Sequence, residues 1–311
     1  MSDQTVSISG RKTPLDYLFF TRPVLMPPVW TIALLGVAES SIKRSVPLWE
    51  WPVFVIQLWC LFGAVYTLNQ ICDIESDRIN RKLFFLPEQI ISVPVAWRFT
   101  IILNAFAVVL AIPFGYEYIA LTAVIIVLGV VYSVGQTPWK NRPLLGFGAN
   151  VMAHGVIVYV LGAVFAGAEV VSVLLPSVAY GCAVGGVYLA TTVADIPGDD
   201  SSGKRTIGVW AGGRLTMLIA SLLVGTAIVL AIWHSQLALA IAAFISLPFF
   251  AWAAQSAPLD RAPLATKVGV AALTLGAAIY FPVYLVFMAG GFFLTRAFFR
   301  WRFGLPYPTF G

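Results

Sequence analysis

VYTLNQICDIESD, residues 65–77, ends a long apolar stretch of the chain with two aspartates four residues apart. A second stretch, VYLATTVADIPGD at residues 187–199, ends in the same way. Superposing Asp73 on Asp195 also aligns the valine, the tyrosine, the isoleucine and the last aspartate of the two stretches. Because both copies end in the same uncommon pattern, DIxxD, the sequence predicts an internal repeat.

The composition around these stretches is that of a membrane protein. Of 311 residues, 59% are hydrophobic and only 11% are charged, whereas a soluble domain carries about 25% charged residues. Long uncharged runs separate clumps of polar residues, and the same numbers exclude a disordered chain. The net charge is +5. In a membrane protein, such an excess is expected from basic residues in cytoplasmic loops that face anionic lipid, so nucleic acid is not an expected partner.

A helix needs about 20 mostly apolar residues to cross a bilayer. By that criterion the sequence predicts an all-α polytopic protein with nine transmembrane helices around a central cavity. One domain over residues 1–311 is expected, with four-helix halves at about 15–135 and 147–255 and a ninth helix at about 265–290. The predicted spans are 15–38, 52–72, 99–115, 117–135, 147–167, 173–194, 214–233, 236–255 and 265–290.

The basic residues predict the orientation of these helices. If the N-terminus is cytoplasmic, 14 of the 19 lysines and arginines fall on the cytoplasmic side, a bias typical of membrane proteins. An integral, multi-pass protein with both acid motifs in cytoplasmic active-site loops is therefore expected. The basic C-terminal stretch TRAFFRWRF works against this bias. The exceptions are Lys43, Arg44, Arg296, Arg300 and Arg302.

The first acid motif is suited to a hard cation. On a continuous helix, Asn69, Asp73 and Asp77 share one stripe. Like charges at this spacing repel, and each acid near a bilayer also loses hydration. A cation offsets both effects, and an all-oxygen ligand set favours Mg²⁺ or Ca²⁺. One such motif alone could be a solvated helix end, but two copies on one side argue against that alternative.

The second motif has a different local sequence. Pro197 disfavours helix, so Asp195 is predicted to close the sixth span and Asp199 to lie in a loop. The following GDDSSGKRT supplies Lys204 and Arg205. Carboxylates for a metal beside bases for an anion are what a diphosphate site requires, because Mg²⁺ is typically shared between a few carboxylates and substrate phosphates.

These segments resemble the UbiA superfamily of intramembrane prenyltransferases. NQICDIESD is similar to the NDxxDxxxD signature of that family, and DIPGDDSSGKRTIGVWAG is similar to its second acid motif with the trailing GKxT loop. TRP at residues 21–23, YSVGQTPWKNRP at 132–143 and the tail RFGLPYPTF also match family segments. The resemblance covers nearly the whole chain, and the family has nine transmembrane helices.

The resemblance implies Mg²⁺-dependent transfer of a polyprenyl group. Two Mg²⁺ ions would hold the diphosphate of a polyprenyl donor, and the allylic cation left by C–O cleavage would alkylate a small aromatic or lipid acceptor, with an aromatic one favoured. The implied metal ligands are Asn69, Asp73, Asp77, Asp195 and Asp199. The implied diphosphate-binding residues are Arg22, Asn69, Arg81, Lys140, Lys204 and Arg205. Tyr132, with the four aspartates, is implied as catalytic near the reacting carbon.

Several positions depart from the family pattern. Gln70 stands where many members have aspartate, and Thr192 where some have a further aspartate. NRKLFFLPEQIIS, residues 80–92, replaces the more usual KPxRP…SG pattern of aromatic prenyltransferases. These differences leave the acceptor open more than the chemistry. His154, inside the fifth span, is either a packed, hydrogen-bonded histidine or an acceptor-side base or orienting group.

Other functions compete for the same residues. A terpene cyclase, or transfer to a non-aromatic lipid or a sugar phosphate, would use the same fold and acids. A cation-coupled transporter also contains repeats and membrane acids, but its site would lie near the bilayer midplane rather than at helix ends. A lipid phosphotransferase acting on CDP-alcohols would need denser acids with DG and AR elements. Prenyl length, oligomeric state and pathway stay open.

Overall fold

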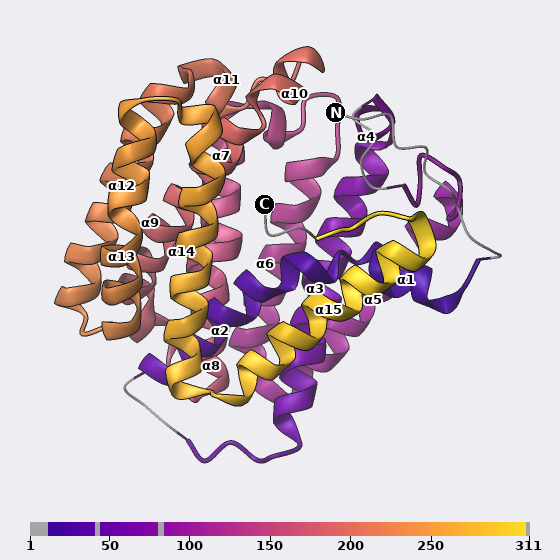
Figure 1. Cartoon of the computed structure of the whole chain (residues 1–311). Coiled ribbons are helices and arrows are strands. Elements are labelled where there is room, and N and C mark those ends of the chain that lie inside the picture. The colour runs from indigo at the N-terminus through magenta and orange to yellow at the C-terminus, as the bar shows by residue number, and fades with distance from the viewer. Residues whose placement is uncertain (1–11, 41–43, 80–83, 309–311) are drawn as a thin grey trace.

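The computed structural model describes residues 12–40, 44–79 and 84–308, and these residues form helices and connections without a strand. Within them, ten helical segments are long and apolar enough to cross a membrane. They are α1 (Pro14–Phe20) with η1 (Pro23–Leu25) and α2 (Met26–Glu39), α3 (Glu50–Cys72), α5 (Val93–Ala111) with η2 (Ile112–Phe114), α6 (Tyr116–Ser133), α7 (Pro143–Asn150) with η4 (Val151–Ile157) and α8 (Val158–Phe165), α9 (Val170–Ala194), α12 (Gly213–Trp233), α13 (Leu237–Gln255), α14 (Pro258–Tyr280) and α15 (Val283–Phe303) (Figure 1).

The all-α prediction and the first eight spans are confirmed, with ends shifted by a few residues. The ninth prediction, 265–290, is wrong because that stretch contains two helices. Phe281, which precedes Pro282, leaves helical geometry with φ −130° and ψ 75°. Proline restricts the residue before it and offers no N–H for helical bonding, so α14 ends here and α15 turns back. Figure 1 shows the two helices meeting at the lower end of the molecule.

The C-terminal helix α15 packs against the N-terminal helix α1 through a buried ion pair and stacked aromatic rings. Arg302 donates to Asp16 with Nε 2.9 Å from Oδ1, and the side chains of both residues are at most 1% exposed. Beside this ion pair, the rings of Phe19 and Phe298 stack with centroids 3.9 Å apart. Breaking a buried ion pair by removing one partner typically costs about 3–5 kcal/mol. α15 is therefore held across the molecule against α1.

Glycines set the distance between α2 and α8. A Cβ atom on Gly162 would lie 1.9 Å from the carbonyl oxygen of Ala33, and one on Gly36 would lie 2.2 Å from that of Tyr159. Small residues at such positions let membrane helices approach until their backbones touch. Because η4 continues directly into α8, this contact also fixes η4 relative to α2.

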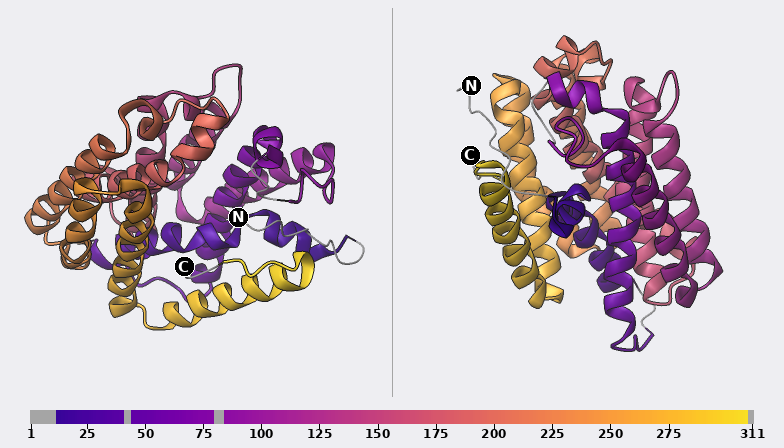
Figure 2. Two further views of the ribbon diagram at one scale, coloured as in Figure 1. Left: turned by 45° about the horizontal axis from the view of Figure 1, so that its top comes forward. Right: turned by 90° about the vertical axis from the view of Figure 1, so that its right-hand side faces the viewer.

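The polar ends of the helices gather on one side of the molecule. At the top of Figure 1, the short helices α4 (Ile74–Ile79), α10 (Ile196–Ser201) and α11 (Ile207–Ala211) follow the ends of α3 and α9. Figure 2 shows α3 and α5 on one side of the molecule and α9, α12 and α13 on the other. The two acid motifs therefore lie at the same end of the bundle.

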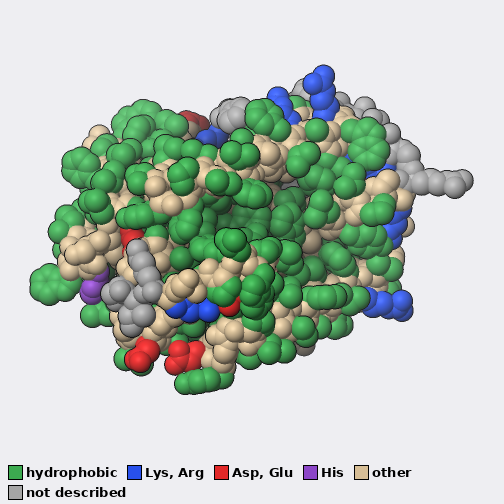
Figure 3. Space-filling model, turned by 90° about the horizontal axis from the view of Figure 1, so that it is seen from below, with side chains coloured by type: hydrophobic (Ala, Val, Ile, Leu, Met, Phe, Trp, Pro, Cys, Tyr) green, Lys and Arg blue, Asp and Glu red, His purple; other side chains and the backbone are tan. Residues whose placement is uncertain are grey.

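Large apolar side chains cover the outside of the bundle. Ile101, Phe106, Val229, Phe244 and Val286 are each at least half exposed. Apolar side chains also dominate the face in Figure 3, which is hollowed near its middle. Soluble proteins rarely expose continuous apolar surface, whereas a bilayer solvates it. The chain is a multi-pass integral membrane protein.

Candidate active site

Each acid motif begins where a long helix is interrupted. Asp73 directly follows α3 and Asp195 directly follows α9, and a short helix starts after each of them. The backbone N–H of the second aspartate then donates to the carbonyl of the first, at 2.8 Å from Asp77 to Asp73 and 2.9 Å from Asp199 to Asp195. Asp73 and Asp195, the two residues at the interruptions, both line one cavity.

The second motif is more helical than its sequence predicts. Ile196–Ser201 forms α10, so Asp199 lies on a short helix and not in a loop. Pro197 lies in the first turn, where its missing N–H has no helical partner to lose and its fixed φ suits a helix. Thr206 Oγ1 donates to Asp199 Oδ2 at 3.1 Å, and the backbone N–H of Lys204 donates to the Asp199 carbonyl at 2.9 Å. The following loop therefore orients this carboxylate.

Two lysines from distant parts of the chain meet at Asp73. Lys140, on η3 (Trp139–Asn141), places Nζ 2.8 Å from Asp73 Oδ1 and 3.2 Å from Asn69 Oδ1. Lys204, from the second motif, places Nζ 3.7 Å from the same aspartate oxygen. The side chains of Asp73 and Lys140 are only 13% and 10% exposed. The loop of the second motif is thus in direct electrostatic contact with the first.

The cavity has a volume of about 510 Å³. Its charged residues are three aspartates and three cations, which balance each other in number. Apolar residues of α2, α13 and α14, such as Ile32, Leu239 and Leu273, form much of the remaining wall. The predicted site residues that line it are Arg22, Asn69, Asp73, Tyr132, Lys140, Asp195, Asp199 and Lys204.

Two predicted site residues of the described chain, Asp77 and Arg205, are not in this wall. Asp77 is buried, one turn after Asp73, but it is not among the residues that line the cavity. Arg205 lines a separate pocket with Arg142 and Trp210. Arg81 lies outside the described residues. The continuous stripe expected for the first motif is broken because α3 ends before Asp73.

Arg22 reaches the cavity from a strained turn. Its backbone is left-handed, with φ 57° and ψ 61°, a conformation that residues with a side chain seldom adopt. Its Nε atom is buried and has no hydrogen-bond partner within the described chain. Strain of this kind persists only where the surrounding structure imposes it, and it is frequent at ligand sites.

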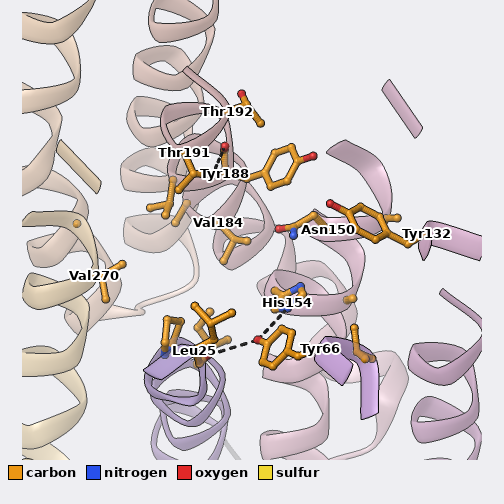
Figure 4. A pocket seen from close by; sticks show the side chains of 18 of the residues that line it. Leu25, Tyr66, Tyr132, Asn150, His154, Val184, Tyr188, Thr191, Thr192 and Val270 are labelled. Atoms are coloured by element: carbon orange, nitrogen blue, oxygen red, sulfur yellow. Dashed lines mark hydrogen bonds between the residues drawn. The ribbon is translucent and has the colours of Figure 1, made fainter. Parts of the chain in front are cut away.

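Further polar residues line the cavity that the sequence analysis did not assign to the site (Figure 4). Tyr66 and Tyr188 are the tyrosines at matching positions of the two repeated stretches. Asn150 and His154 are four residues apart in an otherwise apolar span. Polar residues inside a membrane span usually face a cavity or a partner, and this rule could have identified Asn150.

The carboxylates of the cavity suit a metal ion that the protein and a bound substrate coordinate together, rather than an ion enclosed by protein ligands alone. No three His, Cys, Asp or Glu side chains of the described residues gather closely enough to hold an ion. The aspartates of both motifs nevertheless direct oxygen ligands at one cavity, beside cations suited to phosphate. Mg²⁺ commonly takes one or two carboxylates from a protein and completes its shell with water and substrate phosphates. These residues fit Mg²⁺ bound together with a diphosphate.

A model of the UbiA prenyltransferase family matches residues 25–262, which include both acid motifs and most of the cavity wall. The chain belongs to the UbiA prenyltransferase family. Its predicted membership is therefore confirmed, and the protein is a membrane prenyltransferase.

Relatives within this family act on different acceptors. The chain is 27% identical over 193 residues to a digeranylgeranylglyceryl phosphate synthase of Sulfolobus acidocaldarius, covering 62% of this chain and 68% of that protein. It is 26% identical over 221 residues to the chloroplastic 2-acyl-4-prenylphloroglucinol 6-prenyltransferase of Humulus lupulus, covering 65% of this chain and 53% of that one.

Solved structures share the fold. A UbiA homologue from Archaeoglobus fulgidus bound to GPP and Mg²⁺ aligns with a TM-score of 0.68 and 18% identity, over 88% of this chain and 99% of that chain. A UbiA homologue from Aeropyrum pernix aligns with a TM-score of 0.67 and 18% identity, over 84% and 98% of the two chains.

Proposed function

We propose that this UbiA-family protein transfers the prenyl group of an allylic prenyl diphosphate to an acceptor, with Mg²⁺ as its cofactor. The observation that carries the proposal is the contact of Lys140 and Lys204 with Asp73 in a cavity that Asp195 and Asp199 also line. The Archaeoglobus fulgidus homologues bound to GPP or DMAPP with Mg²⁺ support this donor class.

The charge balance of the cavity supports binding of the diphosphate donor together with a metal ion. The three aspartates and three cations of the wall offset one another before any ligand is bound. A multiply charged diphosphate therefore needs additional positive charge, which Mg²⁺ would bring. Asp73, Asp195 and Asp199 would hold the metal, and Arg22, Lys140 and Lys204 would donate hydrogen bonds to phosphate oxygens. Asn69 is positioned by Lys140 beside them.

The reaction begins with cleavage of the bond between the allylic carbon and the diphosphate oxygen, whose electron pair leaves with the diphosphate. Bound Mg²⁺ supplies Lewis-acid stabilisation of that leaving group. The lysines, fixed before the reaction starts, stabilise the same developing charge without reorganisation. The apolar wall from α2, α13 and α14 holds the prenyl chain and excludes water, so the allylic cation is captured by the acceptor.

Purified protein in nanodiscs tests the proposal with labelled geranyl, farnesyl and geranylgeranyl diphosphates. We expect diphosphate release with Mg²⁺ and none with a chelator. Asp73→Asn and Asp195→Asn should each lower the rate at least about 100-fold, because each removes charge that holds the metal–diphosphate pair. Glu75→Gln is the matched control, since Glu75 is exposed and pairs with exposed Arg78. Normal turnover by either folded aspartate variant would refute the proposal.

A further inference from the structure

A second pocket adjoins the cavity at the end of the bundle that carries the acid motifs. It has a volume of about 390 Å³, and Asn141 lines both it and the cavity. Its walls come from the connection between α6 and α7, from the first turn of α7, and from the segment that joins the second acid motif to α11. Figure 1 shows α11 above α7, against which it packs.

Two arginines of this second pocket carry charge that the protein does not neutralise. Arg142 donates from Nη2 to Thr137 Oγ1 at 2.8 Å, and within the described chain no carboxylate pairs with Arg142 or with Arg205. Two cations held at one pocket repel each other. α7 also begins at Arg142 without a side-chain cap, so its free N–H groups add positive potential. The pocket therefore suits an anion, and guanidinium groups bind phosphate through paired hydrogen bonds.

The remainder of the second pocket is apolar and open to the membrane. Leu144, Leu145 and Trp210 line it and are 67%, 38% and 60% exposed. Because α7 begins a membrane span, its first turn lies where the hydrocarbon meets the head groups, a level at which tryptophan is common. Free phosphate has no apolar part for these side chains to cover. A phospholipid has both a phosphate for the arginines and acyl chains for the leucines.

We propose that this second pocket binds an anionic phospholipid whose phosphate bridges Arg142 and Arg205. A zwitterionic lipid such as phosphatidylcholine would bring its own cation beside the two guanidinium groups, whereas phosphatidylglycerol brings net negative charge. The side on which the pocket lies is the predicted cytoplasmic side, and the cytoplasmic leaflet is the one that is rich in anionic lipid.

The lipid also supports the proposed active site. Lys140 and Arg142 lie two residues apart on one segment, and Lys204 and Arg205 are neighbours on the other. From each segment the lysine contacts Asp73 in the cavity, and the arginine lines the second pocket. A phosphate between the arginines holds the two segments together and so keeps both lysines at Asp73. This effect on the donor site rests on the proposed function, whereas lipid binding itself does not.

Lipid binding is tested on delipidated protein in a neutral detergent. Dioleoyl phosphatidylglycerol, dioleoyl phosphatidylcholine or inorganic phosphate is titrated, and bound lipid is counted by native mass spectrometry. The double variant Arg142→Gln/Arg205→Gln is compared with Arg98→Gln/Arg214→Gln. This control removes the same charge from exposed arginines that lie on the first turns of α5 and α12 and line neither pocket.

We expect phosphatidylglycerol to bind at least about tenfold more tightly than phosphatidylcholine. The Arg142/Arg205 variant should lose at least about tenfold in this affinity, because it loses charge-assisted hydrogen bonds, and the control less than about threefold. Equal losses in the two double variants would show attraction to surface charge alone and overturn the inference. Equal affinity for the two lipids, or full displacement of the lipid by about 10 mM phosphate, a concentration that screens surface charge only weakly, would also overturn it.

The support of the active site is tested in nanodiscs with geranylgeranyl diphosphate and Mg²⁺. Replacing phosphatidylglycerol with phosphatidylcholine should raise the wild-type KM for the donor at least about threefold, because the lysines are then held less firmly at Asp73. The Arg142/Arg205 variant should show the high KM in both lipids. A wild-type KM that is the same in both lipids would overturn this coupling. Absence of diphosphate release by the wild type in either lipid would instead refute the proposed function and leave the binding result standing.

Discussion

At the scale of single residues, Asp73 is the point where the two halves of the site meet. Lys140 approaches it from the connection between α6 and α7, and Lys204 approaches it from the second acid motif. Because Asp73 and Lys140 are mostly shielded from water, their attraction is stronger than that of a surface pair. The lysines keep the carboxylate compensated in the absence of ligand, and they are already in place for phosphate.

Lys140→Met tests this dual role. Removing the ammonium should raise the KM for the donor about tenfold or more, the usual effect of losing one charge-assisted hydrogen bond. The freed Asp73 should at the same time bind Mn²⁺ more tightly in the absence of donor, as measured by electron paramagnetic resonance. Arg98→Met is the control, because exposed Arg98 on α5 does not line the cavity. Unchanged KM and Mn²⁺ affinity would remove Lys140 from the site.

Residue types and family motifs named all six charged residues that line the cavity, but helical spacing alone was less reliable. It predicted that Asp77 would share a stripe with Asp73. The helix is interrupted at Asp73, where no proline or glycine marks a break, so the sequence offers no local sign of it. The contact of Lys204 with Asp73 could not be predicted either, because it depends on how α9 packs in the assembled bundle.

At the scale of helices, hydropathy located eight spans and failed at the ninth. The apolar stretch AAIYFPVYLVF continues through the turn between α14 and α15, so a hydropathy window does not detect the turn. Pro282 was the one residue in this stretch that indicated a helix end. α14 also begins earlier than predicted, at Pro258. The charged side chains of Asp260 and Arg261 in its first turn excluded this part of the helix from a span predicted by apolar character.

Gly162→Ala tests the packing of α2 on α8. The added methyl group would meet the Ala33 carbonyl oxygen at 1.9 Å, a backbone atom that cannot move independently. We expect a loss of about 1–3 kcal/mol of stability, as is usual for overpacking, seen as a lower thermal midpoint in detergent. Gly225→Ala in α12 is the matched control, since a methyl group there meets no atom within 4 Å. Equal midpoints for the two variants would contradict the close contact.

At the scale of the whole molecule, the additional helix changes the inferred topology. The described chain has ten candidate spans. With an even number of spans, the end of α15 that carries Arg296, Arg300 and Arg302 lies on the same side as the start of α1, and Arg302 pairs there with Asp16. Only Lys43 and Arg44 then oppose the positive-inside bias. α1, the end of α15 and both acid motifs would then share one side of the membrane, and the prediction that this side is cytoplasmic stays a prediction. The division into two four-helix halves within one domain stays a prediction.

Reporter fusions test this topology. A cytoplasm-specific reporter should be active at both the N-terminus and the C-terminus, and inactive when inserted between α2 and α3. That connection carries Arg44, whose guanidinium pairs with Glu50 at the end of the bundle away from the acid motifs. Reporter activity at only one of the two termini would support an odd number of spans and contradict the position of α15.

The most direct test of the shared magnesium–diphosphate site is metal binding with and without a donor. Mn²⁺ is titrated into the protein in nanodiscs, with or without a non-cleavable thiolo analogue of geranyl diphosphate. Because the described acids form no closed cage, the account predicts tight binding only when the analogue is present. That binding should be lost in both Asp73→Asn and Asp195→Asn. Tight binding without the analogue, or binding unaffected by either substitution, would contradict the account.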